Sequence, residues 1–143
     1  MTEPSIRIKK IWEDVDFFEV NLEFKGISCT ATLDIYTSND DLEDLRQGIK
    51  RFSIFHQDEF TWTSGIDNGN TTHFLSLRFF LLNKTGTVGI EIIADNKAEK
   101  PYWMRSNFFI LTELGQIDDF DKKIEQLIQE EIAEFEGIIP ITC

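Results

Sequence analysis

Two histidines, His56 and His73, are the side chains of this sequence best suited to metal binding or acid–base chemistry. They stand seventeen residues apart, and no cysteine or carboxylate near them follows a zinc-ligand spacing. A site made of both histidines and a carboxylate such as Asp58 or Asp67 is an alternative. Isolated histidines in polar loops are more often simply solvated. We therefore expect no metal ion.

Nucleophiles and phosphate-binding loops lack the partners that their chemistry needs. Ser64 does not stand in a Gly-x-Ser-x-Gly elbow, and Cys29 has no histidine near it in the sequence. The polar loop over residues 65–72 matches neither the P-loop nor the dinucleotide-binding pattern. Acidic pairs such as Asp40-Asp41 are common on solvated helix faces, whereas acid–base catalysis needs a carboxyl group desolvated beside a cleft. We expect no catalytic residue, no cofactor and no enzymatic activity.

The elements that position these residues follow from the spacing of apolar side chains. Residues 27–35 alternate between apolar and polar, which is typical of an antiparallel strand with one solvated face. Ser38 is the expected N-cap of a helix that runs to Phe52. Apolar residues at three- and four-residue spacing predict a second helix over 116–135. The predicted strands cover residues 5–15, 17–24, 27–35, 59–64, 74–82, 87–94 and 102–114.

This order of three strands, a helix, four strands and a helix predicts an α+β fold. We expect a largely antiparallel sheet of six or seven strands with two helices packed on one face. No linker or internal repeat divides the sequence, so a single domain over residues 1–143 is expected.

The charge balance is the most distinctive property of the composition. The chain has 26 acidic and 14 basic residues, which gives a net charge of −12. Such a charge repels a phosphate backbone and an anionic membrane surface, and it attracts a basic protein. We therefore predict a basic protein partner and no direct contact with nucleic acid or membrane. The alternative is that the acidity serves only solubility.

Half of this net charge lies between residues 116 and 136, where eight acidic residues and two lysines occur. The acidic residues avoid the apolar stripe of the predicted helix, so they should lie on its solvent side. Such a face is usually only solvated, but it also raises the rate of association with a basic partner. Residues 65–72 and 40–44 are secondary candidates. The predicted partner-binding residues are Asp118, Asp121, Glu125, Glu130, Glu134 and Glu136.

Apolar and basic side chains share the outer face of the predicted sheet. Two arginines among aromatic residues make a loose candidate for nucleic-acid binding, which carries little weight against the net charge. The aromatic residues favour a protein-interaction patch or a homodimer contact instead. The alternative is that the first strand or residues 138–141 cover them. These residues are Arg78, Phe80, Leu82, Ile93, Trp103, Arg105 and Phe109.

The cellular compartment is predicted from three absences in the sequence. No run approaches the roughly 20 apolar residues of a membrane span. Residues 1–4 lack the basic and apolar regions of a signal peptide. Cys29 fits a small buried residue and Cys143 an exposed thiol, so no disulfide is expected. We therefore expect a cytoplasmic protein.

One part of the sequence carries a family resemblance. A strand that alternates Ser or Thr with apolar residues ends in Asp34-Ile35-Tyr36 and enters a helix through Ser38-Asn39-Asp40-Asp41-Leu42. This pattern resembles the WapI-type immunity proteins, which are small cytosolic bacterial proteins that neutralise a contact-dependent tRNase toxin. The hairpin over 74–94 and the closing amphipathic helix are similar too, so the resemblance covers most of the chain.

The resemblance implies that this chain is an immunity protein that binds a basic nuclease toxin stoichiometrically. It supplies no site residue, because the pattern specifies none. Two other functions stay open: a generic adaptor or oligomerising module that uses the outer sheet face, and, less favoured, a small hydrolase or ligand-binding protein.

Overall fold

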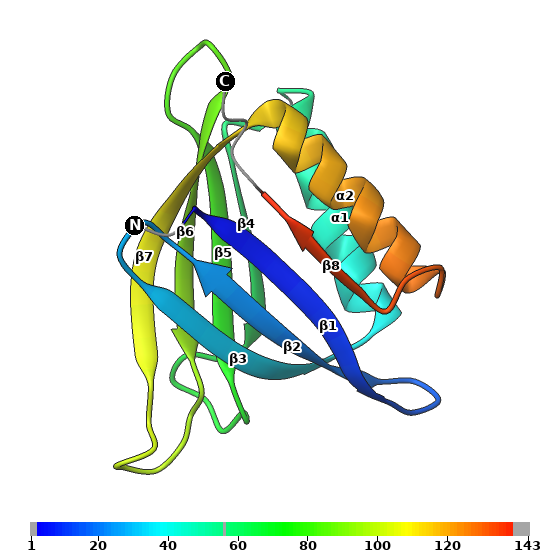
Figure 1. Cartoon of the computed structure of the whole chain (residues 1–143), viewed down its shortest axis with the longest axis vertical. Helices are drawn as coiled ribbons and strands as arrows, with labels where there is room; N and C mark the ends of the chain where they lie inside the picture. Colours follow the sequence, from blue (N-terminus) through cyan, green and yellow to red (C-terminus); the bar gives the residue numbers. More distant parts are fainter. Residues whose placement is uncertain (1–2, 56, 139–143) are drawn as a thin grey trace.

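The computed structural model describes residues 3–55 and 57–138, which form eight strands and two helices (Figure 1). The predicted α+β class is confirmed. In chain order the elements are β1 (Ser5–Glu13), β2 (Phe18–Lys25), β3 (Thr30–Thr37), α1 (Asn39–Ser53), β4 (Glu59–Gly65), β5 (Phe74–Leu81), β6 (Thr87–Asp95), β7 (Arg105–Glu113), α2 (Leu114–Ile128) and β8 (Glu134–Gly137).

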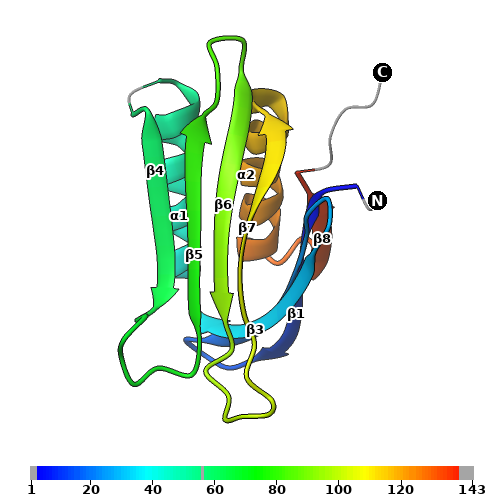
Figure 2. The ribbon, with the colours of Figure 1, turned by 90° about the vertical axis from the view of Figure 1, so that its left-hand side faces the viewer.

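The strands form two antiparallel sheets rather than the one sheet that we expected. One sheet has the order β3-β2-β1-β8 and the other has the order β4-β5-β6-β7. The first sheet crosses in front of the second, and α1 and α2 lie side by side along one flank (Figure 1). The outer face of the second sheet points away from both helices (Figure 2). We therefore place the core between the two sheets and the helix pair.

Alternation along the strands explains how this core forms. In β2, Val20, Leu22 and Phe24 are buried while the residues between them remain partly exposed. Because successive strand residues point to opposite faces, every second side chain reaches the interior. The buried apolar residues of both sheets and both helices make one continuous cluster.

Helix α1 begins as the sequence predicts, because the Ser38 side chain accepts a hydrogen bond from the backbone N–H of Asp41 at 3.2 Å. Gly48 lets the helix approach β4 closely. A β-carbon at Gly48 would lie 1.9 Å from Cζ of Phe60.

Neither helix in the described part of the chain is long and apolar enough to cross a membrane.

The predicted helix over 116–135 is wrong at its end. Helix α2 ends at Ile128, Glu130 has a φ of 61°, and residues 134–137 form β8 beside β1. The apolar spacing of Ile132 and Phe135 continues the helical stripe. Phe135 and Gly137 also fit a strand whose alternate residues are buried. Pairing with β1, at the other end of the chain, selects the strand.

Candidate functional site: an acidic corner

The β1–β2 hairpin ends in a tip that is both acidic and apolar. The backbone N–H of Asp14 donates to the carbonyl oxygen of Phe17 at 2.8 Å, and the Asp14 carboxylate accepts from the N–H of Val15 at 2.7 Å. The strand register shifts between Lys10 and Trp12, as at a β-bulge, which increases the twist of a hairpin. Val15 is 92% exposed, and Trp12 and Phe17 are exposed beside it.

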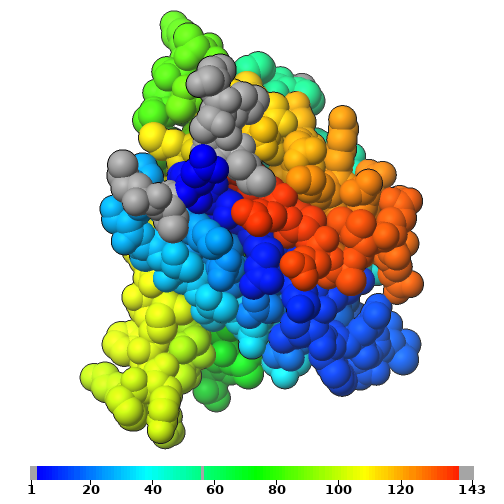
Figure 3. All heavy atoms as spheres, in the orientation of Figure 1, coloured from blue at the N-terminus to red at the C-terminus, as the bar shows by residue number. Residues whose placement is uncertain are grey.

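Two other segments meet this hairpin, namely the start of α1 and the turn after α2. In Figure 3 the blue hairpin lies beside the orange-red residues of that turn. A hollow of about 260 Å³ between the three segments is lined by Glu13, Asp14, Val15, Asp16, Phe18, Ser38, Asn39, Asp40 and Glu130. A second hollow, of about 400 Å³, is lined by Lys10, Glu13, Glu130, Glu131, Ile132 and Ala133. We call Glu13, Asp14, Asp16, Asp40, Glu130 and Glu131 the acidic corner.

The acidic corner carries an excess of negative charge that the described residues do not neutralise. Lys10 is the single cation among the residues that line the two hollows. Its Nζ lies 3.9 Å from a carboxylate oxygen of Glu13 and 4.5 Å from the ring centre of Phe18. In this pair the side chain of Lys10 is 10% exposed and that of Glu13 is 53% exposed, and the pair leaves the other five carboxylates without a cation among the described residues. Exposed apolar side chains beside several carboxylates suit contact with a basic protein surface.

The structure separates the six predicted partner-binding residues. Glu130 lies in the acidic corner, and Asp118 is exposed on α2. Glu134 and Glu136 lie on β8 rather than on a helix, and Glu134 is 3.6 Å from the guanidinium of Arg7. The predicted single acidic face of one helix is therefore wrong.

Asp121 and Glu125, the remaining two, turn toward Arg46 of α1 and hold the helices together. Arg46 is buried, and its Nε donates to Asp121 at 3.0 Å while its other nitrogens reach Glu43 and Glu125. Burial acts to lower the pKa of Arg46, but the hydrogen bonds and charges of Asp121 and Glu43 outweigh it and raise this pKa. Asp121 therefore has a structural partner within the molecule.

A serine–histidine contact was not foreseen from the sequence. Oγ of Ser64 lies 2.7 Å from Nε2 of His73, and Oγ1 of Thr72 lies 3.3 Å from its Nδ1. His73 is 6% exposed, and burial lowers its pKa, so its imidazole is neutral near pH 7. The pair has the spacing of a nucleophile and its base, but Nδ1 faces a hydroxyl group where catalytic triads place a carboxylate. The feature of the sequence that could have indicated this contact is that Ser64 and His73 stand on either side of one hairpin loop.

Metal ligation finds no further support in the geometry. Residues 3–55 and 57–138 contain no group of three or more His, Cys, Asp or Glu side chains that could hold an ion. His56, the other candidate, lies outside the described residues.

The outer face of the second sheet carries an apolar patch, in which Phe80 and Phe109 are predicted outer-face residues and Leu111 is not. Phe80 and Phe109 meet edge to face with their ring centres 6.1 Å apart, and Phe109 and Leu111 are exposed. The Arg78 guanidinium lies 4.6 Å from the ring centre of Phe80 and donates to Glu91 at 2.9 Å. We call Phe80, Phe109 and Leu111 the sheet patch.

At the lower end of this sheet, Arg105 and Trp103 are held by carboxylates. Arg105 contacts Asp67 at 2.8 Å and Asp95 at 3.0 Å, and the indole N–H of Trp103 donates to Asp95 at 2.9 Å. Burial acts to raise the pKa of Asp95, but donors including Trp103 and Arg105 outweigh it and lower this pKa. Both predicted outer-face residues thus also fix the β6–β7 loop.

Comparisons with known proteins give two similar folds and no family. No protein-family profile and no curated protein matches the chain. The solved structure of the plant transcriptional regulator PBF-2 matches with a TM-score of 0.49 and 7% identity over 90% of this chain and 76% of that one. The structure of WHY3 from Arabidopsis thaliana matches with the same score and identity, over 90% of this chain and 82% of that one.

These similarities correct one prediction. The match to PBF-2, a transcriptional regulator, stands against our prediction of no direct contact with nucleic acid. That prediction rested on net charge alone, and we withdraw it.

Proposed function

We propose that this chain is a non-enzymatic protein-binding domain that neutralises a basic nuclease toxin in the cytoplasm by stoichiometric binding through the acidic corner. The acidic corner is the observation that carries this proposal, because it joins five carboxylates that have no ion-pair partner among the described residues to exposed apolar side chains. The resemblance to WapI-type immunity proteins supplies the class of partner.

The chemistry of such an interface follows from the two kinds of side chain. A nuclease presents lysine and arginine where it binds the phosphate backbone, and carboxylates of the acidic corner would occupy those cations. Trp12, Val15 and Phe17 would supply the apolar contact that holds the complex once formed. The toxin would then be unable to reach its RNA.

A growth-rescue experiment tests the proposal. Immunity genes adjoin the gene of their toxin, so the C-terminal domain encoded immediately upstream should be expressed with and without this chain. We expect the chain to restore growth and to stop RNA cleavage in vitro at one molar equivalent. Failure to protect against that domain at any ratio would refute the immunity role.

Charge reversal locates the interface. The triple variant Asp16→Lys, Glu130→Lys and Glu131→Lys removes three exposed acidic-corner carboxylates whose side chains make no hydrogen bond or ion pair within the described residues. We expect the association rate at low salt to fall about tenfold or more, because steering by complementary fields is lost.

The matched control changes the net charge equally at a distance from the acidic corner. It carries Glu3→Lys, Asp58→Lys and Glu99→Lys, all at exposed positions. Its association rate should stay much nearer to that of the unchanged chain. Equal slowing by both triples would mean that overall charge, rather than the acidic corner, drives association.

The sheet patch favours a second candidate function, an adaptor or oligomerising module. Phe109 and Leu111 are exposed side by side on neighbouring positions of one face. Analytical ultracentrifugation showing a dimer that persists at high salt and dissociates in Phe109→Glu would support this function over the first.

A further inference from the structure

Strand β3 forms an open edge of its sheet. Among residues 3–55 and 57–138 it pairs with β2 alone, in a continuous register from Thr30 to Thr37. In an antiparallel pair, alternate residues direct their N–H and C=O groups away from the neighbouring strand. One row of main-chain donors and acceptors on β3 therefore points away from β2.

This edge lacks the features that usually block further pairing. Such features are charged side chains (above all lysine), proline on the edge, a β-bulge, or a very short strand. The eight residues of β3 include neither lysine nor proline, Asp34 is their one charged residue, and the β2–β3 register has no shift. The opposite edge of the same sheet is different, because β8 has four residues and carries Glu134 and Glu136 outward.

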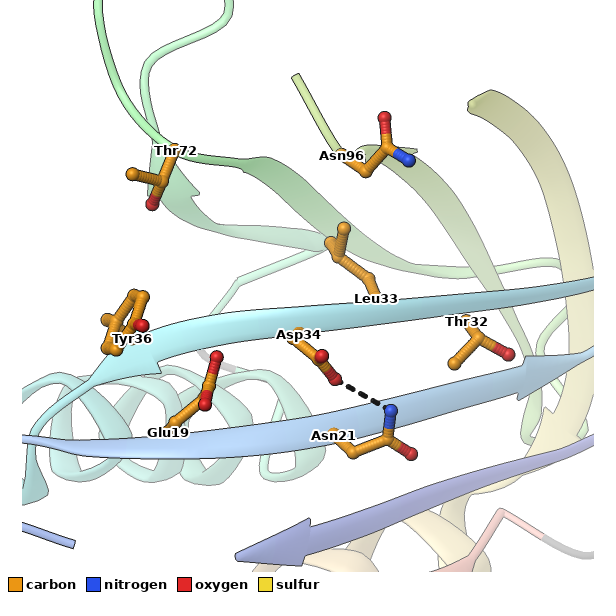
Figure 4. Close-up of a pocket in the computed structure, with 8 residues that line it drawn as sticks. All are labelled: Glu19, Asn21, Thr32, Leu33, Asp34, Tyr36, Thr72 and Asn96. Carbon is orange, nitrogen blue, oxygen red and sulfur yellow. Dashed lines mark hydrogen bonds between the residues drawn. The ribbon is translucent and has the colours of Figure 1, made fainter. Parts of the chain in front are cut away.

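A hollow of about 350 Å³ lies along the edge and gives it a second wall. Figure 4 shows Thr72, from the β4–β5 loop, and Asn96, which follows β6, across the hollow from β3. The β3 edge and these two loop residues thus bound a space in which a chain segment could lie beside β3. The lining residues are Glu19, Asn21, Thr32, Leu33, Asp34, Tyr36, Thr72 and Asn96.

The polar groups of this hollow select a cationic occupant. Its lining contains two carboxylates, of Glu19 and Asp34, and no lysine or arginine. Asp34 accepts a hydrogen bond from Asn21 at 2.7 Å, whereas the Glu19 side chain makes no hydrogen bond or ion pair with another described residue. Tyr36 is 51% exposed at the same edge and offers its ring to a cation.

We propose that the β3 edge binds an extended polypeptide segment with lysine or arginine at alternate positions. The segment adds as a fifth strand to the sheet, pairs its main chain with residues 32–36, and places its cations against Glu19, Asp34 and Tyr36. Five residues of strand span roughly 16 Å. Strand addition takes affinity from main-chain hydrogen bonds and specificity from alternate side chains.

This site is separate from the acidic corner and does not depend on the proposed function. A toxin that bound only to the corner would leave the β3 edge free, and a chain without any toxin partner would still have it.

The test uses an eight-residue peptide that alternates arginine with valine, together with two relatives of it. One relative has N-methylated backbone nitrogens and the same charge, and the other alternates glutamate with valine. We expect the first peptide to bind and to slow hydrogen exchange at alternate amides of residues 32–36, measured by NMR. Equal binding of the N-methylated peptide, or protection confined to the β1–β2 hairpin, would overturn the proposal.

Single substitutions check the cationic preference. Glu19→Lys and Asp34→Lys should each weaken binding of the arginine peptide about tenfold or more, because an attractive charge becomes repulsive. The conservative variant Asp34→Asn keeps an acceptor for Asn21 and should have a smaller effect. The control Asp16→Lys, in the acidic corner, should bind as the unchanged chain does. Binding that weakens equally in Asp16→Lys and in Asp34→Lys would also overturn the proposal.

Discussion

At the residue scale, Arg46 illustrates how a charge can be required by its neighbours. Its guanidinium lies between the helices, where Asp121 is buried with it and Glu43 and Glu125 are partly exposed. A buried ion pair of this kind adds little net stability compared with apolar residues of the same shape. Removing one partner alone, however, leaves the other charged in a poorly solvated place.

We therefore expect Arg46→Met to destabilise the protein by about 3–5 kcal/mol, because Asp121 is left without its cation. The double variant Arg46→Met with Asp121→Leu should recover most of this loss. Urea unfolding gives both free energies. Arg51→Met, at an exposed position of the same helix, is the control and should change the stability by less than about 0.5 kcal/mol.

His73 gives a pH dependence at the same scale. Burial lowers its pKa in the folded protein, so the unfolded chain binds a proton more readily. The stabilisation that His73 contributes is fully present above its pKa in the unfolded chain, about 6.5. It is lost as the pH drops from there through the lower pKa of His73 in the folded protein. As the pH drops from 8 to 5, the unfolding midpoint of the unchanged chain should therefore fall more steeply than that of the variant His73→Gln. Parallel curves would contradict this assignment.

At the element scale, two glycines in helices have opposite surroundings. A β-carbon at Gly48 would meet the ring of Phe60, which itself stacks on Phe79 with ring centres 5.9 Å apart. A β-carbon at Gly115 of α2 would meet nothing within 4 Å. Gly48 thus sets how closely α1 approaches the sheet, whereas Gly115 has no such role.

Gly48→Ala should destabilise the protein by about 1–3 kcal/mol, because the crowding outweighs the better helix propensity of alanine. Gly115→Ala should stabilise it by up to about 1 kcal/mol through propensity alone. Thermal unfolding of the two variants measures this contrast. An equal effect of both substitutions would mean that the packing against Phe60 yields without strain.

At the scale of the whole molecule, the net charge of −12 opposes compactness, and the acidic corner concentrates part of it. Like charges repel most at low ionic strength, where the Debye length is longest and screening is weakest. The acidic corner thus gathers part of this repulsion in one place.

The corner triple variant, Asp16→Lys, Glu130→Lys and Glu131→Lys, should therefore be more stable than the unchanged chain in 10 mM salt, by roughly 1 kcal/mol. The difference should vanish near 1 M salt, where the Debye length is about 3 Å. Unfolding free energies at the two salt concentrations provide the measurement. A difference that persists at high salt would point to packing instead of charge.

Sequence patterning predicts the local elements well and their distant partners poorly. The alternation in 27–35 and the cap at Ser38 are local signals, and both correspond to elements of the structure. The strand after α2 depends on β1, more than a hundred residues earlier, and no local spacing distinguishes it from a helix. Likewise, the acidic corner gathers residues 13–16, 40 and 130–131, and only Glu130 of these was among the six predicted partner-binding residues.

The pairing of β8 with β1 also has a consequence for biosynthesis. Ile6 stands opposite Gly137, and Ile8 stands opposite Phe135. While the ribosome still holds residues 134–137, the nascent chain presents β1 as an unpaired edge with its apolar residues incompletely covered. Assembly of this sheet is therefore complete only after residues 134–137 have emerged, and the interval between the emergence of β1 and that of β8 is the period in which this edge is open to aggregation and to chaperones.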